Sequence, residues 1–88
     1  MNGYRLDTTI LTARIHKFTL IISHQNVDAE TLADQLYGAG CDDALFSVAG
    51  GVYHLDFDRE AASLKDAIQS AIRSVESSGA QILRIIIH

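Results

Sequence analysis

The spacing of apolar residues divides most of this chain into segments with a strand period or a helix period. Residues 15–23 (IHKFTLIIS) are rich in β-branched and aromatic side chains with apolar residues at every second position, which predicts a strand with one side in the core. Apolar residues then return at helical spacing after Asp28. We predict a helix that Asp28 caps and that Gly38 or Gly40 ends.

Two further strands are predicted on either side of Gly50-Gly51. If these glycines form a two-residue hairpin loop, one side of the hairpin takes the pairs Val48–Tyr53, Phe46–Leu55 and Ala44–Phe57. The opposite side takes the mixed pairs Ala49–Val52, Ser47–His54 and Leu45–Asp56. A slip of one residue would mix the two sets, so the pattern favours this register.

A second helix is predicted from the spacing of Ser63 and Asp66, which matches a capping box, and from the apolar stripe that follows. It should end near Gly79. Residues 81–88 (QILRIIIH) then predict a last strand. We expect its inward residues to be Leu83, Ile85 and Ile87, and its outward residues to be Ile82, Arg84 and Ile86.

This order of elements predicts an α+β domain of the ferredoxin-like βαββαβ type, a four-stranded antiparallel sheet with two helices on one face. The first and third strands should be central, and the second and fourth should be edges. We expect one domain over residues 15–88 and an N-terminal arm over residues 1–14. The arm's apolar residues are out of phase with the first strand, which predicts a bulge or break near His16. The arm could cover the outer face of the sheet, extend the first strand, cross to a second subunit or fray.

Composition narrows the classes of function. The chain has 88 residues and a net charge of −4, with eleven acidic and seven basic residues, which argues against nucleic-acid binding by this chain alone. The single Cys41 excludes an internal disulfide and a zinc site built from several thiolates. The sequence shows neither an apolar run of about 20 residues nor a signal peptide, so we expect a cytoplasmic protein with no membrane partner.

Candidate catalytic and metal-binding residues all have simpler structural interpretations. The four histidines, His16, His24, His54 and His88, fit no metal-ligand spacing. Cys41 precedes two carboxylates that should raise its pKa, so we expect a small buried residue rather than a nucleophile. We therefore expect no cofactor, no metal and no enzymatic activity.

The remaining acidic and glycine-rich motifs are also interpreted structurally. Asp42 and Asp43 suit a turn, and Asp56, Asp58 and Glu60 suit solvated positions at the end of a strand. The glycine pair lacks the pattern of a phosphate-binding loop.

The outer face of the predicted sheet is the strongest candidate for function, because it combines branched apolar residues with a few polar ones. The predicted interface consists of Ile21, Leu45, Val52, His54, Ile82, Arg84 and Ile86. We expect self-association, or binding of another protein, through this face or through the edge of the last strand. Scattered surface hydrophobic residues are the alternative without function, and a small-ligand-sensing regulatory domain is the functional alternative, on analogy of fold alone.

Three segments resemble a family of small, largely uncharacterised bacterial proteins: residues 36–44 (LYGAGCDDA), residues 55–62 (LDFDREAA) and residues 67–72 (AIQSAI). The resemblance covers about residues 16–84. In that family the module precedes a helix-turn-helix segment, on which the proteins are grouped with DNA-binding regulators. That segment does not follow here, so we do not expect DNA binding to carry over, and the family supplies no catalytic residues.

Overall fold

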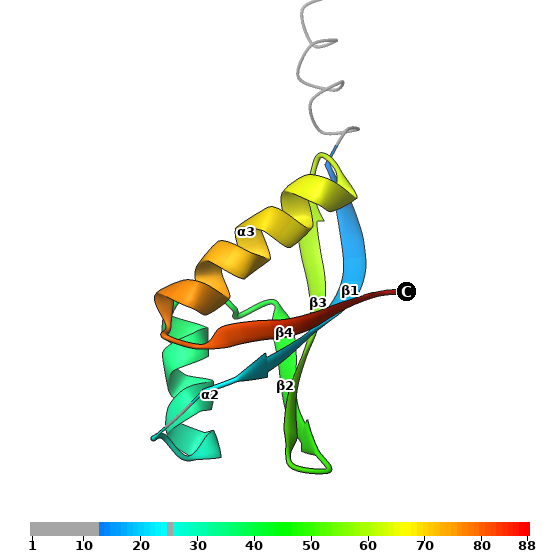
Figure 1. The fold of residues 1–88 in the computed structure, drawn as a ribbon. Helices are drawn as coiled ribbons and strands as arrows, with labels where there is room; N and C mark the ends of the chain where they lie inside the picture. Colours follow the sequence, from blue (N-terminus) through cyan, green and yellow to red (C-terminus); the bar gives the residue numbers. More distant parts are fainter. Residues whose placement is uncertain (1–12, 25) are drawn as a thin grey trace, which may run out of the picture.

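The computed structural model describes residues 13–24 and 26–88. Along the chain, the elements are β1 (Arg14–Ser23), α2 (Ala29–Gly38), β2 (Ala44–Ala49), β3 (Val52–Ala61), α3 (Leu64–Ser77) and β4 (Gln81–Ile87). The strands form one antiparallel sheet in the order β2-β3-β1-β4, with α2 and α3 on one side of it (Figure 1). The predicted ferredoxin-like α+β fold is confirmed, with β1 and β3 in the centre.

Both helices begin at the predicted capping residues. The Asp28 carboxylate accepts a hydrogen bond from the backbone N–H of Thr31 at 2.8 Å, and the Ser63 hydroxyl accepts one from the N–H of Asp66 at 3.1 Å. These side chains satisfy N–H groups that have no partner within the first helical turn. Helix α2 ends at Gly38, one of the two predicted residues.

The β2–β3 hairpin has the predicted register at all six pairs, from Ala44–Phe57 to Ala49–Val52. Gly50 and Gly51 have φ angles of +60° and +78°, so both loop residues are left-handed. Only glycine adopts two successive conformations of this kind without steric cost, and they match the twist of the strands that the loop joins.

The core lies between the sheet and the two helices. On the sheet side, Phe18 and Phe57 stack with ring centroids 5.2 Å apart. The helices add Leu32 and Leu36 from α2, and the small residues of α3 let this helix lie close to the sheet. The buried residues of α3 are Ala67, Ala71 and Val75.

The predicted irregularity in β1 lies at the other end of the strand. The β1–β3 ladder runs without a shift from Arg14–Ala61 to Ile22–Tyr53, so the predicted bulge near His16 is wrong. The register instead shifts in the β1–β4 ladder, between Ile21 and Ile22. The prediction of an arm concerns mainly residues 1–12, which lie outside the described residues.

This shift changes the sides of the sheet that the first residues of β4 occupy. Ile21 pairs with Arg84, but Ile22 pairs with Ile82, so Leu83 is an extra residue. Ile82 packs against the core, and its predicted outward position is wrong. Leu83, predicted to be buried, is 55% exposed.

The end of β4 keeps its predicted side but not its predicted burial. Ile85 and Ile87 pair with the core residues Leu20 and Phe18, and therefore share the helix-bearing side. They are nevertheless 43% and 58% exposed. Figure 1 shows the reason, because α3 passes near the start of β4 whereas the strand continues beyond the helices to the C-terminus.

Candidate functional site: the β4 edge and the outer face

The outer face of the sheet carries two rows of residues that run across all four strands. The register aligns Ser47, His54, Ile21 and Arg84 in one row. It aligns Leu45, Asp56, Thr19 and Ile86 in the next. Polar residues therefore occupy much of the centre of this face, and apolar residues lie on the edge strands.

The structure places five of the seven predicted interface residues on this face with exposed or half-buried side chains. Leu45 is the most exposed at 68%; the others are Val52, His54, Arg84 and Ile86. Ile21 lies on the same face but is only 6% exposed between its cross-strand neighbours His54 and Arg84, so it offers little surface to a partner. Ile82 faces the core and does not belong to the face.

A chain of hydrogen bonds crosses the outer face through Thr19, whose side chain is buried. The Thr19 hydroxyl donates to Asp56 Oδ1 at 2.5 Å and lies 2.7 Å from His88 Nε2. A hydroxyl has one proton, so once it donates to the carboxylate, the His88 Nε2–H must donate to Thr19. The chain thus joins β3, β1 and the residue after β4.

The acidic residues of β3 are exposed, as the sequence predicts, and two of them also accept hydrogen bonds from β1. Asp56 accepts the hydrogen bond of Thr19, and Asp58 accepts one from the Lys17 ammonium at 2.9 Å. The Lys17–Asp58 pair is well exposed on both sides, so it contributes little to stability. Both contacts link β3 to β1 on the outer face.

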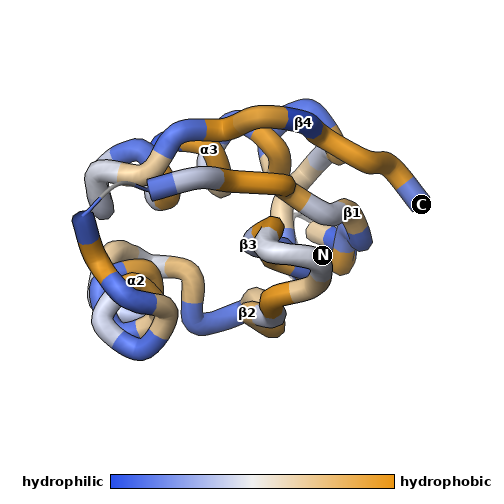
Figure 2. The backbone as a smooth tube through the Cα atoms, turned by 60° about the horizontal axis from the view of Figure 1, so that its bottom comes forward, coloured by the Kyte–Doolittle hydropathy of each residue, from blue (hydrophilic) through white to orange (hydrophobic). Residues whose placement is uncertain are grey.

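The edge strand β4 carries three exposed aliphatic side chains, those of Leu83, Ile85 and Ile87. The strand reads QILRIII, with Arg84 as its one charged residue and no proline, and Figure 2 shows most of it as hydrophobic up to its end. Within residues 13–24 and 26–88 this strand ends the sheet, so one row of its backbone N–H and C=O groups lacks a strand partner. Edge strands with little charge and no proline readily accept another strand.

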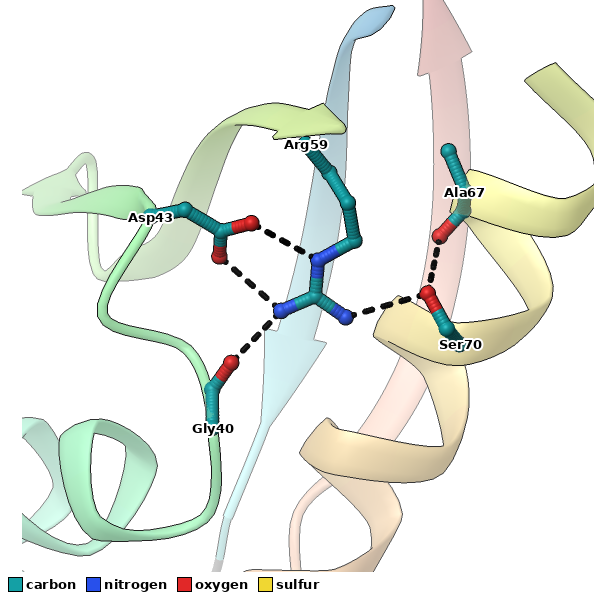
Figure 3. A network of polar contacts seen from close by, with 5 residues as sticks. All are labelled: Gly40, Asp43, Arg59, Ala67 and Ser70. Carbon is teal, nitrogen blue, oxygen red and sulfur yellow. Dashed lines mark hydrogen bonds and ion pairs between the residues drawn. The ribbon is translucent and has the colours of Figure 1, made fainter. Parts of the chain in front are cut away.

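A second polar cluster, which the sequence analysis missed, surrounds the buried Arg59 of β3 (Figure 3). Its guanidinium donates two parallel hydrogen bonds to Asp43, at 2.8 and 2.9 Å, and further bonds to the carbonyl of Gly40 and the hydroxyl of Ser70. The Arg59 guanidinium carbon also lies 4.9 Å from the ring centroid of Phe57.

This cluster has a structural role. It joins the loop before β2 to β3 and α3, and Asp43 acts as an ion-pair partner as well as a turn residue. The hydrogen bonds that Arg59 donates to the Asp43 carboxylate raise the pKa of Arg59, so the guanidinium stays charged. The alternation of β3 offered one signal for this site, because Arg59 falls on the core-facing side after Leu55 and Phe57.

Cys41 is buried beside the Arg59 cluster and is poorly suited to act as a nucleophile. Burial raises the pKa of its thiol to about 11, with smaller upward contributions from Asp43 and Asp42 and a downward one from Arg59. The predicted direction of the pKa shift is confirmed, but burial contributes more than the carboxylates.

Two hollows lie at the ends of the helices. One, of about 290 Å³, is lined by Ser23, His24, Gly79 and Gln81. The other, of about 470 Å³, is lined by Gln35, Gly38, Ala39, Ser77 and Ser78. Both are polar and open to solvent, unlike the enclosed, mostly apolar pockets that bind small molecules.

Among the described residues, no group of three or more histidine, cysteine, aspartate or glutamate side chains could hold a metal ion. The helices found in that part of the chain are too short or too polar to cross a membrane. No protein-family model matches the sequence, and no curated protein or solved structure is significantly similar to it.

Proposed function

We propose that this domain is a non-enzymatic interaction module that self-associates through the edge of β4. The observation that carries the proposal is the exposure of Leu83, Ile85 and Ile87 on an edge strand with one charged residue. A second copy that adds its own β4 would satisfy the free backbone groups and cover these side chains in one step.

A second copy is the partner that best matches this edge. Two β4 strands that pair antiparallel present the same surface to each other, so the contact closes as a dimer. Pairing of β4 with the other edge, β2, would leave a free edge on each copy and propagate into a filament. An apolar strand that recognises an identical strand needs no complementary charge, and β4 offers almost none.

The energetics predict a dimer that dissociates on dilution. Each of the three exposed aliphatic side chains would contribute roughly 1 kcal/mol on partial burial. In a dimer, six such side chains and the new backbone hydrogen bonds favour association, whereas the loss of translational and rotational freedom costs roughly 4–15 kcal/mol. The two contributions are of similar size. The mass should therefore depend on protein concentration.

Light scattering over a range of concentrations tests the proposal. We expect the mass to rise from 9.6 kDa towards twice that value. The double variant Ile85→Lys/Ile87→Lys should remain a monomer, because each β4 strand would then carry two ammonium groups, and these would repel the ammonium groups on the strand of the second copy. A wild-type protein that stays monomeric at every concentration would refute the proposal.

Leu45→Lys is the matched control, because Leu45 is also an exposed aliphatic residue of an edge strand, but on β2. It should dimerise like the wild-type protein. Loss of the dimer in this variant and not in the β4 variant would move the interface to the outer face near β2, which the sequence analysis also favours.

The resemblance to modules of bacterial regulators supports the same function, since such regulators commonly act as dimers on symmetric sites. We place the protein in the cytoplasm within this proposal, and its acidic balance argues against direct contact with nucleic acid. The ligand-sensing alternative has no comparable support, because the two hollows are open to solvent and polar.

A further inference from the structure

We infer that two copies of this chain pair their β4 strands antiparallel with Ile85 opposite Ile85 of the second copy. This inference rests on the proposed self-association and adds its register. The register decides which side chains meet across the dimer axis, and therefore which substitutions break the contact.

Symmetry leaves few choices. A two-fold axis between two identical antiparallel strands places one residue opposite its own copy, and its neighbours then pair in order on either side. Within the strand Gln81–Ile87, each of residues 82–86 can be the centre if three or more residues of each strand are to pair. Ile82 and Leu83 are poor centres, because they lie at the bulge of β4 and would leave the exposed Ile87 opposite no strand residue of the second copy.

Arg84 is a poor centre although it would pair the whole strand. It would place two exposed guanidinium groups directly opposite each other on the outer face. Like charges at directly opposed positions destabilise a strand pair, and neither copy of β4 supplies an acidic residue to separate them.

Ile86 is a poor centre for a different reason. Centred there, only residues 85–87 of each strand pair with strand residues of the other copy. Arg84 would then lie opposite His88 beyond the end of the strand, and the exposed Leu83 would have no cross-strand partner.

A centre at Ile85 keeps the two Arg84 side chains apart and gives Leu83 a cross-strand partner. Ile85 then contacts its own copy on the helix-bearing side, where each is half-exposed in the single chain. Leu83 comes opposite Ile87 of the second copy, so the three exposed aliphatic residues of each strand gain an apolar neighbour. On the outer face Arg84 lies opposite Ile86 of the second copy, and its aliphatic stem can cover that side chain while the guanidinium stays in water.

Single cysteine substitutions read the register directly. Opposed residues in an antiparallel pair have Cα atoms about 4.5 or 5.5 Å apart, within the range of a disulfide, whereas diagonal neighbours lie about 7–8 Å apart, beyond it. We expect Ile85→Cys to form a disulfide-linked dimer in oxidised glutathione. The matched variants Arg84→Cys and Ile86→Cys should each form at least tenfold less disulfide-linked dimer.

The buried Cys41 need not be removed, since its raised thiol pKa keeps it protonated at pH 8, and the wild-type protein under the same oxidant measures any contribution from it. Light scattering of each reduced variant shows whether it still dimerises, and its unfolding curve shows whether it folds.

The outcomes separate the register from the proposed function. Preferential cross-linking through position 84 or 86 in a protein that dimerises would overturn the register and leave the self-association intact. A dimer in which none of the three positions cross-links would overturn pairing of β4 about any of these three residues. A wild-type monomer would remove both the register and the proposed function.

Discussion

Ile82 pairs with Ile22 on the helix-bearing side of the sheet, although a regular continuation of the Ile21–Arg84 pairing would place Leu83 there. The extra residue moves Ile82 into contact with the core and leaves Leu83 exposed. One backbone irregularity thus decides which aliphatic residues of β4 stabilise the fold and which are available to a partner.

Lysine substitutions should distinguish these two classes of residue. Ile82→Lys places an ammonium group against the core, and we expect it to lower the free energy of unfolding by about 2 kcal/mol or more. Ile86→Lys, on the half-buried outer position opposite Thr19, should cost less than about 1 kcal/mol. Urea unfolding measured at low protein concentration, where the chain is monomeric, gives both values. Equal losses would contradict the bulge at Leu83.

Asp43→Ala should destabilise the protein by about 2–3 kcal/mol, because it removes two hydrogen bonds from a buried guanidinium that stays charged. Asp42→Ala is the control, because the neighbouring Asp42 carboxylate is exposed. This substitution should lower the free energy of unfolding by less than about 0.5 kcal/mol. Chemical denaturation at neutral pH compares the two. A similar cost for both would mean that loop conformation, and not the Arg59 ion pair, is the source of the stability.

Thr19→Val should lower the free energy of unfolding by about 1–2 kcal/mol, because it keeps the shape of the side chain but removes the hydroxyl that joins Asp56 to His88. Thr19→Ser retains the hydroxyl and should recover the part of the loss that comes from hydrogen bonding. Thermal unfolding of the three proteins in one buffer measures this. If valine is tolerated and serine is not, packing of the Thr19 methyl group matters more than the polar chain.

The contribution of Cys41 to stability should fall as the pH rises. Its pKa is raised from 9.0 to about 11, so above pH 9 the unfolded state loses this proton while the folded state keeps it. The stabilisation is therefore complete below pH 9 and is lost progressively from pH 9 to about 11. Because lysine and tyrosine also titrate there, the measured quantity is the difference from Cys41→Ala across that range. A difference that does not change with pH would contradict the pKa shift.

Local signals along the chain predicted most of the fold. Asp28 and Ser63 cap the helices as expected, because the hydrogen bonds that a cap makes lie within three residues of it. The glycine pair sets the hairpin register for the same reason, since a two-residue loop leaves no freedom in the pairing beyond it. The ferredoxin-like order follows from these elements and the short connections between them.

The candidate site was predictable only in part. The outer face and its residues Leu45, Val52, His54, Arg84 and Ile86 follow from strand alternation once the fold is known. The burial of Ile21 does not, because it depends on the size of the cross-strand neighbours His54 and Arg84. The hydrogen bonds of Arg59 reach residues up to 19 positions away, which no local pattern reveals.

Sequence patterns were thus enough to predict the order of elements, the helix caps, the hairpin register and the mixed character of the outer face, because each depends on contacts within a few residues or on a fixed two-residue period. Long-range packing in the folded chain sets the position of the bulge, the burial of Ile82 and the exposure of Ile85 and Ile87. These follow from how β4 pairs with a strand about sixty residues earlier and from how far α3 reaches along it. The end of β4 is exposed because α3 lies near the start of this strand and then diverges from it across the sheet (Figure 1).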